Sequence, residues 1–136
     1  MSLVIDCSLT MAWAFADEAD ETADAVLERV GERGAVVPAL WPLEVANVLL
    51  TAERRGRLTG ADSALFLDLL SRLPIAIDEQ TASRAFLQTF HLGRELALSA
   101  YDAAYLELAA RLDLPLATRD ARLAEAARRL GVKLPA

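Results

Sequence analysis

Short apolar runs alternate along the chain with longer segments of helical periodicity. The apolar runs are three to five residues long, and we predict a β-strand at each of them: 3–6, 35–38, 74–78, 114–118 and 132–134. Between the runs, apolar residues recur every three or four positions with charged residues opposite them. This pattern predicts helices over 7–16, 19–33, 41–57, 60–73, 79–97 (interrupted near Gly93), 98–113 and 121–131.

Capping residues mark the starts of several of these helices. Ser8 is the expected N-cap of the first helix, and Thr59 with Asp62 forms a variant of the capping box. Ser99 and Asp120 are expected to cap the last two helices. Strand and helix therefore alternate with no linker and no internal repeat.

The alternation determines the expected architecture. Parallel strands need crossover connections and are buried on both faces, which agrees with short apolar strands separated by helices. We therefore predict one domain over 1–136, a three-layer α/β/α fold with a parallel sheet of about five strands.

Composition narrows the class of protein. The chain has 136 residues, 54% of them hydrophobic, and no apolar run approaches the roughly 18 residues that a membrane helix needs. Its opening segment lacks a basic region, so we expect a cytoplasmic location and no membrane contact. The net charge of -6 argues against a broad basic surface for nucleic acid. The lone Cys7 is expected to be a small, inert core residue.

Four acidic residues occupy positions where an open parallel sheet binds ligands or where a helix begins. Asp6 ends the first strand, Glu44 lies in the first turn of the helix after the second strand, Asp102 opens the penultimate helix, and Asp120 follows the fourth strand. Helix capping is an alternative explanation for Asp102 and Asp120, because acids in a first helical turn are stabilised by the macrodipole.

Helical geometry favours a functional interpretation for two of the acids. Asp102 lies on the face of its helix opposite Arg111, and Glu44 lies opposite Glu53, so both acids turn away from the solvated side. A carboxylate in such a setting is costly unless a cation or hydrogen-bond donors compensate it. Asp6 ends a strand that we expect to be central and buried.

Carboxylates gathered without histidine suit Mg²⁺ or Mn²⁺ better than zinc. The only histidine, His91, lies outside the strand exits, which argues against Ser-His-Asp or Cys-His catalysis. The sequence contains no Gly-rich phosphate loop and no dinucleotide fingerprint. Metal-assisted hydrolysis of a phosphodiester is the chemistry that these residues support best.

Four blocks, in order and at compatible spacing, resemble the PIN-domain ribonucleases, most closely the VapC-type toxins of bacterial toxin–antitoxin pairs. The blocks are VIDCS, LEVANVL, YDAAYLELA and ATRDARL, and the likeness spans essentially the whole chain. The family fold is a parallel five-stranded sheet covered by helices on both sides. The resemblance implies that Asp6, Glu44, Asp102 and Asp120 bind one or two Mg²⁺ or Mn²⁺ ions that activate water to cleave RNA.

The resemblance also implies further residues and partners. Ser8 and Thr118 match small hydroxyl residues that orient carboxylates or water beside the metal. Family members are usually homodimers, inhibited by a VapB-like antitoxin that lies across a groove near the site. Trp13, Phe15 and Trp41 are candidates to line that groove, with burial in the core as the alternative.

An acidic protein needs local cations to attract RNA. Arg119 adjoins the acids in sequence and is a candidate RNA contact, and the densest basic cluster is formed by Arg54, Arg55 and Arg57. Solvated arginines at a helix end explain that cluster equally well.

Two other functions remain open at this point. A receiver-type phosphoacceptor domain has a similar length and fold, with Asp78, Thr118 and Lys133 as acceptor, hydroxyl and lysine, although it needs an acidic pair where this chain has only Asp6. The other alternative is a non-catalytic PIN module that only binds RNA or protein.

Overall fold

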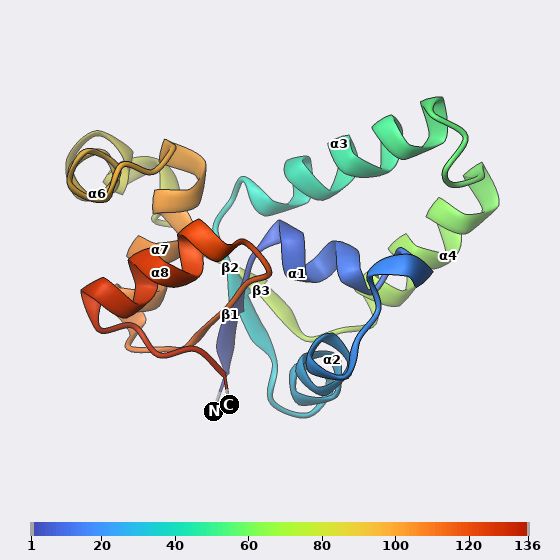
Figure 1. The fold of residues 1–136 in the computed structure, drawn as a ribbon, viewed down its shortest axis with the longest axis horizontal. Helices are drawn as coiled ribbons and strands as arrows, with labels where there is room; N and C mark the ends of the chain where they lie inside the picture. The colour runs from blue at the N-terminus through green and yellow to red at the C-terminus, as the bar shows by residue number, and fades with distance from the viewer. Residues whose placement is uncertain (1, 136) are drawn as a thin grey trace.

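In the computed structural model, which describes residues 2–135, four strands form a parallel sheet (Figure 1). The strands are β1 (Leu3–Ile5), β2 (Ala35–Val37), β3 (Ile75–Ile77) and β4 (Leu116–Ala117). Their order across the sheet is β3-β2-β1-β4. The chain thus extends the sheet in one direction from β1 to β3, and then returns to the free side of β1 to add β4.

Helices cover both faces of this sheet. In Figure 1, α7 and α8 lie on one side of the strands, and α1 and α2 lie on the other. α3 packs along α1, and α4 turns back from the end of α3. The predicted three-layer α/β/α architecture is therefore confirmed. The helical elements are α1 (Cys7–Ala12), the 3-10 turn η1 (Ala16–Glu18), α2 (Glu21–Arg33), α3 (Trp41–Arg54), α4 (Gly60–Ser71), α5 (Thr81–Arg84), the π-helical segment η2 (Ala85–Thr89), α6 (Phe90–Leu96), α7 (Ala100–Leu112) and α8 (Ala121–Leu130).

The central strand is the centre of the hydrophobic core. Leu3, Val4 and Ile5 of β1 have no exposed surface, and Leu106 and Leu108 of α7 are equally buried. Burial on both faces explains why the sequence of β1 is apolar without alternation. No helix within residues 2–135 is long and apolar enough to cross a membrane.

Several expected details differ from the structure. The helix expected over 7–16 ends at Ala12, and Ala16–Glu18 forms a separate 3-10 turn. The segment 132–134 forms no strand, although the Leu116 N–H donates to the Lys133 carbonyl over 2.9 Å, so the tail borders β4 through this bond. The helix over 79–97 departs from α geometry at Ala85–Thr89 rather than at Gly93. No Gly or Pro lies between 81 and 92, so the sequence carries no local signal of this π-helical segment.

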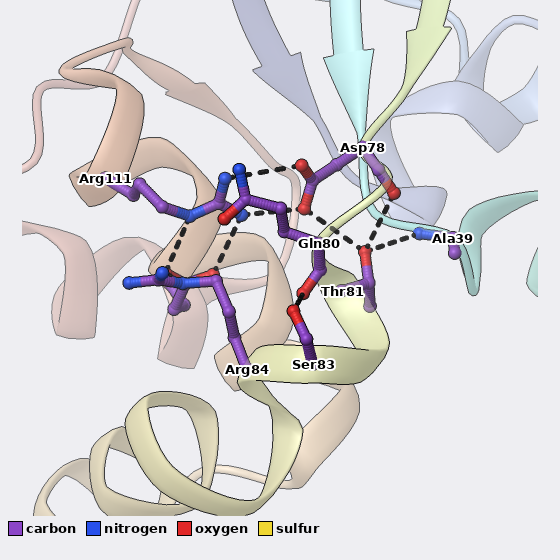
Figure 2. Close-up of polar contacts among 8 residues, drawn as sticks. Ala39, Asp78, Gln80, Thr81, Ser83, Arg84 and Arg111 are labelled. Atoms are coloured by element: carbon purple, nitrogen blue, oxygen red, sulfur yellow. Dashed lines mark hydrogen bonds and ion pairs between the residues drawn. The ribbon is translucent and has the colours of Figure 1, made fainter.

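A buried ion-pair network joins the exit of β3 to α5 and α7 (Figure 2). An Arg111 nitrogen lies 2.6 Å from an Asp78 oxygen and another lies 3.0 Å from a Glu107 oxygen, while Arg84 approaches Glu107 to 2.7 Å. The Arg111, Asp78 and Glu107 side chains are at most 15% exposed, so the expectation that the Arg111 face of its helix is solvated was wrong. Burial tends to raise the pKa of Asp78, but hydrogen bonds and charge from Arg111 outweigh it and hold that pKa below its ordinary value. Asp78 is therefore a structural anion.

We predict that Arg111→Gln destabilises the fold strongly, because it leaves two buried carboxylates without their shared partner. The free energy of unfolding should fall by about 3 to 5 kcal/mol, measured by urea denaturation. Arg128→Gln, which breaks the exposed pair with Glu125, is the matched control and should change it by less than about 0.5 kcal/mol. Equal losses in both variants would contradict a structural role for the network.

Candidate active site

The carboxyl ends of β1 and β4 lie side by side. The parallel register pairs Val4 with Leu116 and Ile5 with Ala117, so Asp6 and Thr118 are the next residues on the two strands. Because the chain leaves β1 toward β2 on one side and places β4 on the other, this position is the topological switch point of the sheet. Open parallel sheets bind ligands at such points.

Asp6 is a buried carboxylate, 4% exposed, that forms the centre of a hydrogen-bonded cluster. It accepts the Leu9 N–H at 2.8 Å, the Ser8 hydroxyl at 2.8 Å and the Thr118 hydroxyl. The N-cap of α1 is therefore Asp6, and the prediction that Ser8 caps this helix was wrong. Ser8 lies two residues after the N-cap, and its hydroxyl donates to the capping carboxylate instead.

Ser8 and Thr118 connect Asp6 to the loop that follows β4. The Ser8 oxygen accepts the Arg119 N–H at 2.9 Å, and the Thr118 oxygen accepts the Asp120 N–H at 3.0 Å. Each hydroxyl thus donates to the Asp6 carboxylate and accepts from the loop. The two small hydroxyl residues hold both the buried acid and the start of α8 in place.

Glu44 approaches from the first turn of α3. Its side chain is half-buried, and its Oε1 accepts the phenol hydroxyl of Tyr105 on α7 at 2.5 Å. Burial raises the pKa of Glu44, the Tyr105 bond opposes that rise, and the charge of Asp102 adds to it. Glu44 is therefore within electrostatic reach of the acid on the neighbouring helix.

Asp102 and Asp120 occupy the starts of α7 and α8. Ser99 caps α7 by accepting the Asp102 N–H at 3.1 Å, and Asp120 caps α8 by accepting two N–H groups through Oδ1. Both capping predictions are confirmed. Within residues 2–135 the Asp102 carboxylate accepts no hydrogen bond from the protein, although its side chain is half-buried.

Asp102 interacts electrostatically with each of the other three acids. Burial first, and then the charge of Asp120, raise the pKa of Asp102 above its ordinary value. The charge of Asp102 in turn raises the pKa of Asp6 and of Glu44. Burial is the largest cause for Asp6, whose pKa rises from 3.8 to about 6. The acids from four separate segments thus form one mutually repelling group.

The donor set can be compared with what a metal ion requires. In residues 2–135, no three His, Cys, Asp or Glu side chains are arranged so that they could hold an ion together. Protein donors already bind oxygens of Asp6, Glu44 and Asp120. Asp102 is a half-buried anion with no such donor, beside three other carboxylates. The chemistry of this all-oxygen set fits a hard divalent cation, which would reverse the repulsion.

Other candidate residues lie outside this group. The Arg119 guanidinium pairs with Asp20 at the start of α2, 2.6 Å away. Arg57 lies over the Phe15 ring and pairs with Asp17 and Glu18. Burial and the nearby charges of Glu44 and Asp6 raise the pKa of the Cys7 thiol to about 12, so it stays protonated at neutral pH.

Two residues that the sequence did not single out lie beside the acids. Tyr105 follows Asp102 by three positions, so both lie on the same face of α7. Arg122 donates to the Ala97 carbonyl at 3.0 Å, and its charge acts to lower the pKa of Asp102. The i, i+3 spacing was a usable signal for Tyr105, whereas the contact of Arg122 with the end of α6 depends on tertiary structure.

We predict that titration of Asp6 makes the free energy of unfolding depend on pH. Its folded pKa of about 6 exceeds the ordinary 3.8, so folding favours the protonated form. The stabilisation that protonated Asp6 contributes is therefore fully present when the pH is below its ordinary pKa of 3.8, and it is lost as the pH rises through about 6. In chelator, the wild-type chain should lose roughly 2 to 3 kcal/mol relative to Asp6→Asn between about pH 4 and pH 8. Parallel urea-denaturation profiles for the two proteins would contradict this.

Comparison with known proteins agrees with the fold. The family model described as PIN domain matches residues 3–129. Ribonuclease VapC3 of Pyrobaculum aerophilum is 30% identical over 125 residues, which cover 92% of this chain and 94% of that protein. The crystal structure of PAE2754 from Pyrobaculum aerophilum superposes with a TM-score of 0.69 at 23% identity, covering 93% of this chain and 87% of the other. The chain therefore belongs to the PIN-domain family, in the group of VapC-type ribonucleases.

Proposed function

We propose that this chain is a Mg²⁺- or Mn²⁺-dependent endoribonuclease and the toxin of a toxin–antitoxin pair. The observation that carries the proposal is the half-buried Asp102 carboxylate, which accepts no hydrogen bond within residues 2–135 and is electrostatically coupled to Asp6, Glu44 and Asp120 at the switch point of the sheet. The similarity to Ribonuclease VapC3 supports RNA as the substrate.

In this proposal the four acids would hold one or two cations, with Asp6, Glu44 and Asp102 at the first and Asp120 completing the site, and their side chains would draw together as the ion binds. When bound, a divalent cation would lower the pKa of a coordinated water and offset charge on the scissile phosphate. Ser8 and Thr118 fix the Asp6 carboxylate through their hydroxyls. The same two hydroxyls accept hydrogen bonds from the backbone of the adjacent loop. They therefore fix the position of Asp120 relative to Asp6.

Two arginines beside the acids are the proposed RNA contacts. Arg122 lies close enough to Asp102 to act on its pKa, and Arg119 reaches the same edge of the sheet from the loop after β4. Arg119 has to exchange Asp20 for a phosphate, since the two side chains are paired. Arg119→Gln and Arg122→Gln should each weaken RNA binding and reduce its salt dependence, measured by fluorescence anisotropy across a salt series.

A VapB-like antitoxin and a second copy of the chain are the proposed protein partners, acting in the cytoplasm. A hollow of about 620 Å³ between the end of α1 and α4 is lined by Trp13, Phe15, Phe66 and Arg57, which suits an inhibitory peptide. Phe15 and Trp41 are both buried in the core, whereas Trp13 is only partly buried. Light scattering of the pure chain should give a dimer mass, and co-expression with its cognate antitoxin should suppress toxicity.

The receiver-type alternative does not fit this structure. Its acceptor would be Asp78, which is 10% exposed and paired with Arg111. A non-catalytic PIN module is the remaining alternative. Such a module would not cleave RNA, so replacing one of its acids would change no cleavage activity.

We predict that Asp6→Asn and Asp102→Asn each reduce metal-dependent RNA cleavage by about a hundredfold or more, because loss of a ligand costs more than loss of an outer partner. Expression of either variant should no longer inhibit growth. Cleavage of a labelled RNA in Mg²⁺ or Mn²⁺, and in chelator, measures the effect.

The matched control is Asp113→Asn, at the exposed opposite end of the helix that carries Asp102. Asn also tolerates the left-handed backbone found there, with φ of 54°. This control should cleave like the wild type. Full activity of Asp102→Asn, or cleavage that persists in chelator, would contradict the proposal of a metal-dependent nuclease.

A further inference from the structure

Tyr105 is a buried phenol whose hydroxyl faces the acidic group. The residue is 1% exposed and lies in the core with Leu106 and Leu108 of the same helix. A buried tyrosine normally needs a hydrogen-bond partner for its hydroxyl, and here that partner is a carboxylate oxygen of Glu44 at 2.5 Å. The bond joins α7 to α3 across 61 positions of sequence.

The Glu44 carboxylate depends on this hydrogen bond. Tyr105 is the donor that the structure gives to the Glu44 carboxylate within residues 2–135. Glu44 is half-buried and repelled by Asp102, so its charge is costly without a donor. Without the hydroxyl, nothing described would stop the glutamate from turning toward solvent. One oxygen of Glu44 is occupied by Tyr105, which leaves the other free to bind a ligand.

Asp102 and Tyr105 lie one turn apart on the same face of α7. The helix therefore presents an acid and the donor that holds a second acid, and any movement of α7 moves both together. Tyr105 is also near enough to Asp6 for the charge of that carboxylate to raise the pKa of its hydroxyl. Tyr105 is thus hydrogen-bonded to Glu44 and electrostatically linked to Asp6.

We propose that Tyr105 is a positioning residue that acts through Glu44, holding one carboxylate oxygen so that the other faces the cation shared with Asp102. This inference rests on the proposed function. It assigns Tyr105 no contact with RNA and no proton transfer. Its effect is to reduce the conformational freedom that Glu44 would lose on binding a cation.

Mn²⁺ binding to the purified full chain, followed by electron paramagnetic resonance without RNA, tests this inference. Tyr105→Phe keeps the buried ring and removes the hydroxyl, and should weaken Mn²⁺ binding by about tenfold or more. Tyr101→Phe is the matched control, since Tyr101 is 65% exposed on the same helix, and it should change binding by less than about twofold. Circular dichroism verifies that both variants fold.

A double-mutant cycle separates positioning from a general loss of structure. If Tyr105 acts through Glu44, then Tyr105→Phe should have little further effect on Mn²⁺ binding in a Glu44→Gln background. Equal losses in both backgrounds, or wild-type affinity in Tyr105→Phe, would overturn the inference while leaving the proposed function intact. Failure of the wild-type chain to bind Mn²⁺ would instead overturn the metal-dependent proposal and this inference with it.

A second measurement needs no variant of the buried ring. The Tyr105 ring resonances of the wild-type chain should shift as Mg²⁺ is added, because its acceptor oxygen belongs to a carboxylate that binds the ion. Saturation with Mg²⁺ that leaves those resonances unchanged would overturn the inference.

Discussion

The parallel register between β1 and β4 is the constraint on which the site depends. Main-chain hydrogen bonds set it, including Val4 N–H to the Pro115 carbonyl at 2.9 Å and Asp6 N–H to the Ala117 carbonyl at 3.2 Å. It places Asp6 beside Thr118, and the two hydroxyl residues then fix the following loop. A slip of one residue would turn each side chain to the opposite face of the sheet. The buried strands therefore determine the geometry of the acids.

The same fold creates an electrostatic conflict at this edge of the sheet. Burial raises the pKa of Asp6, Glu44 and Asp102, and the charge of Asp102 adds to the first two. Carboxylates with raised pKa values lower folding stability at neutral pH, so the core must outweigh them. Thr118, Ser8 and Tyr105 reduce this cost by donating hydrogen bonds. Such a local conflict is typical of functional sites.

Asp6 and Asp78 both lie at strand exits, but their tertiary partners give one a place in the candidate site and the other a structural role. Asp6 follows β1 and Asp78 follows β3, and each comes after a short apolar run. Arg111 neutralises Asp78, so its pKa falls below the ordinary value. Asp6 is buried, and the donors it has within residues 2–135 are neutral, so burial, with a smaller contribution from the charge of Asp102, raises its pKa despite those hydrogen bonds. The identity of the partner, which lies far away in sequence, decides between the two roles.

The sequence by itself determined the elements and the candidate acids. Hydrophobic periodicity located four strands, local capping rules located Thr59, Ser99 and Asp120, and strand exits pointed to the acids, because these signals depend on neighbouring residues. Tertiary structure alone decided the strand order, the capping of α1 by Asp6 and the bond from Tyr105 to Glu44. Those features depend on contacts between segments far apart in the chain, whose energies no local pattern records.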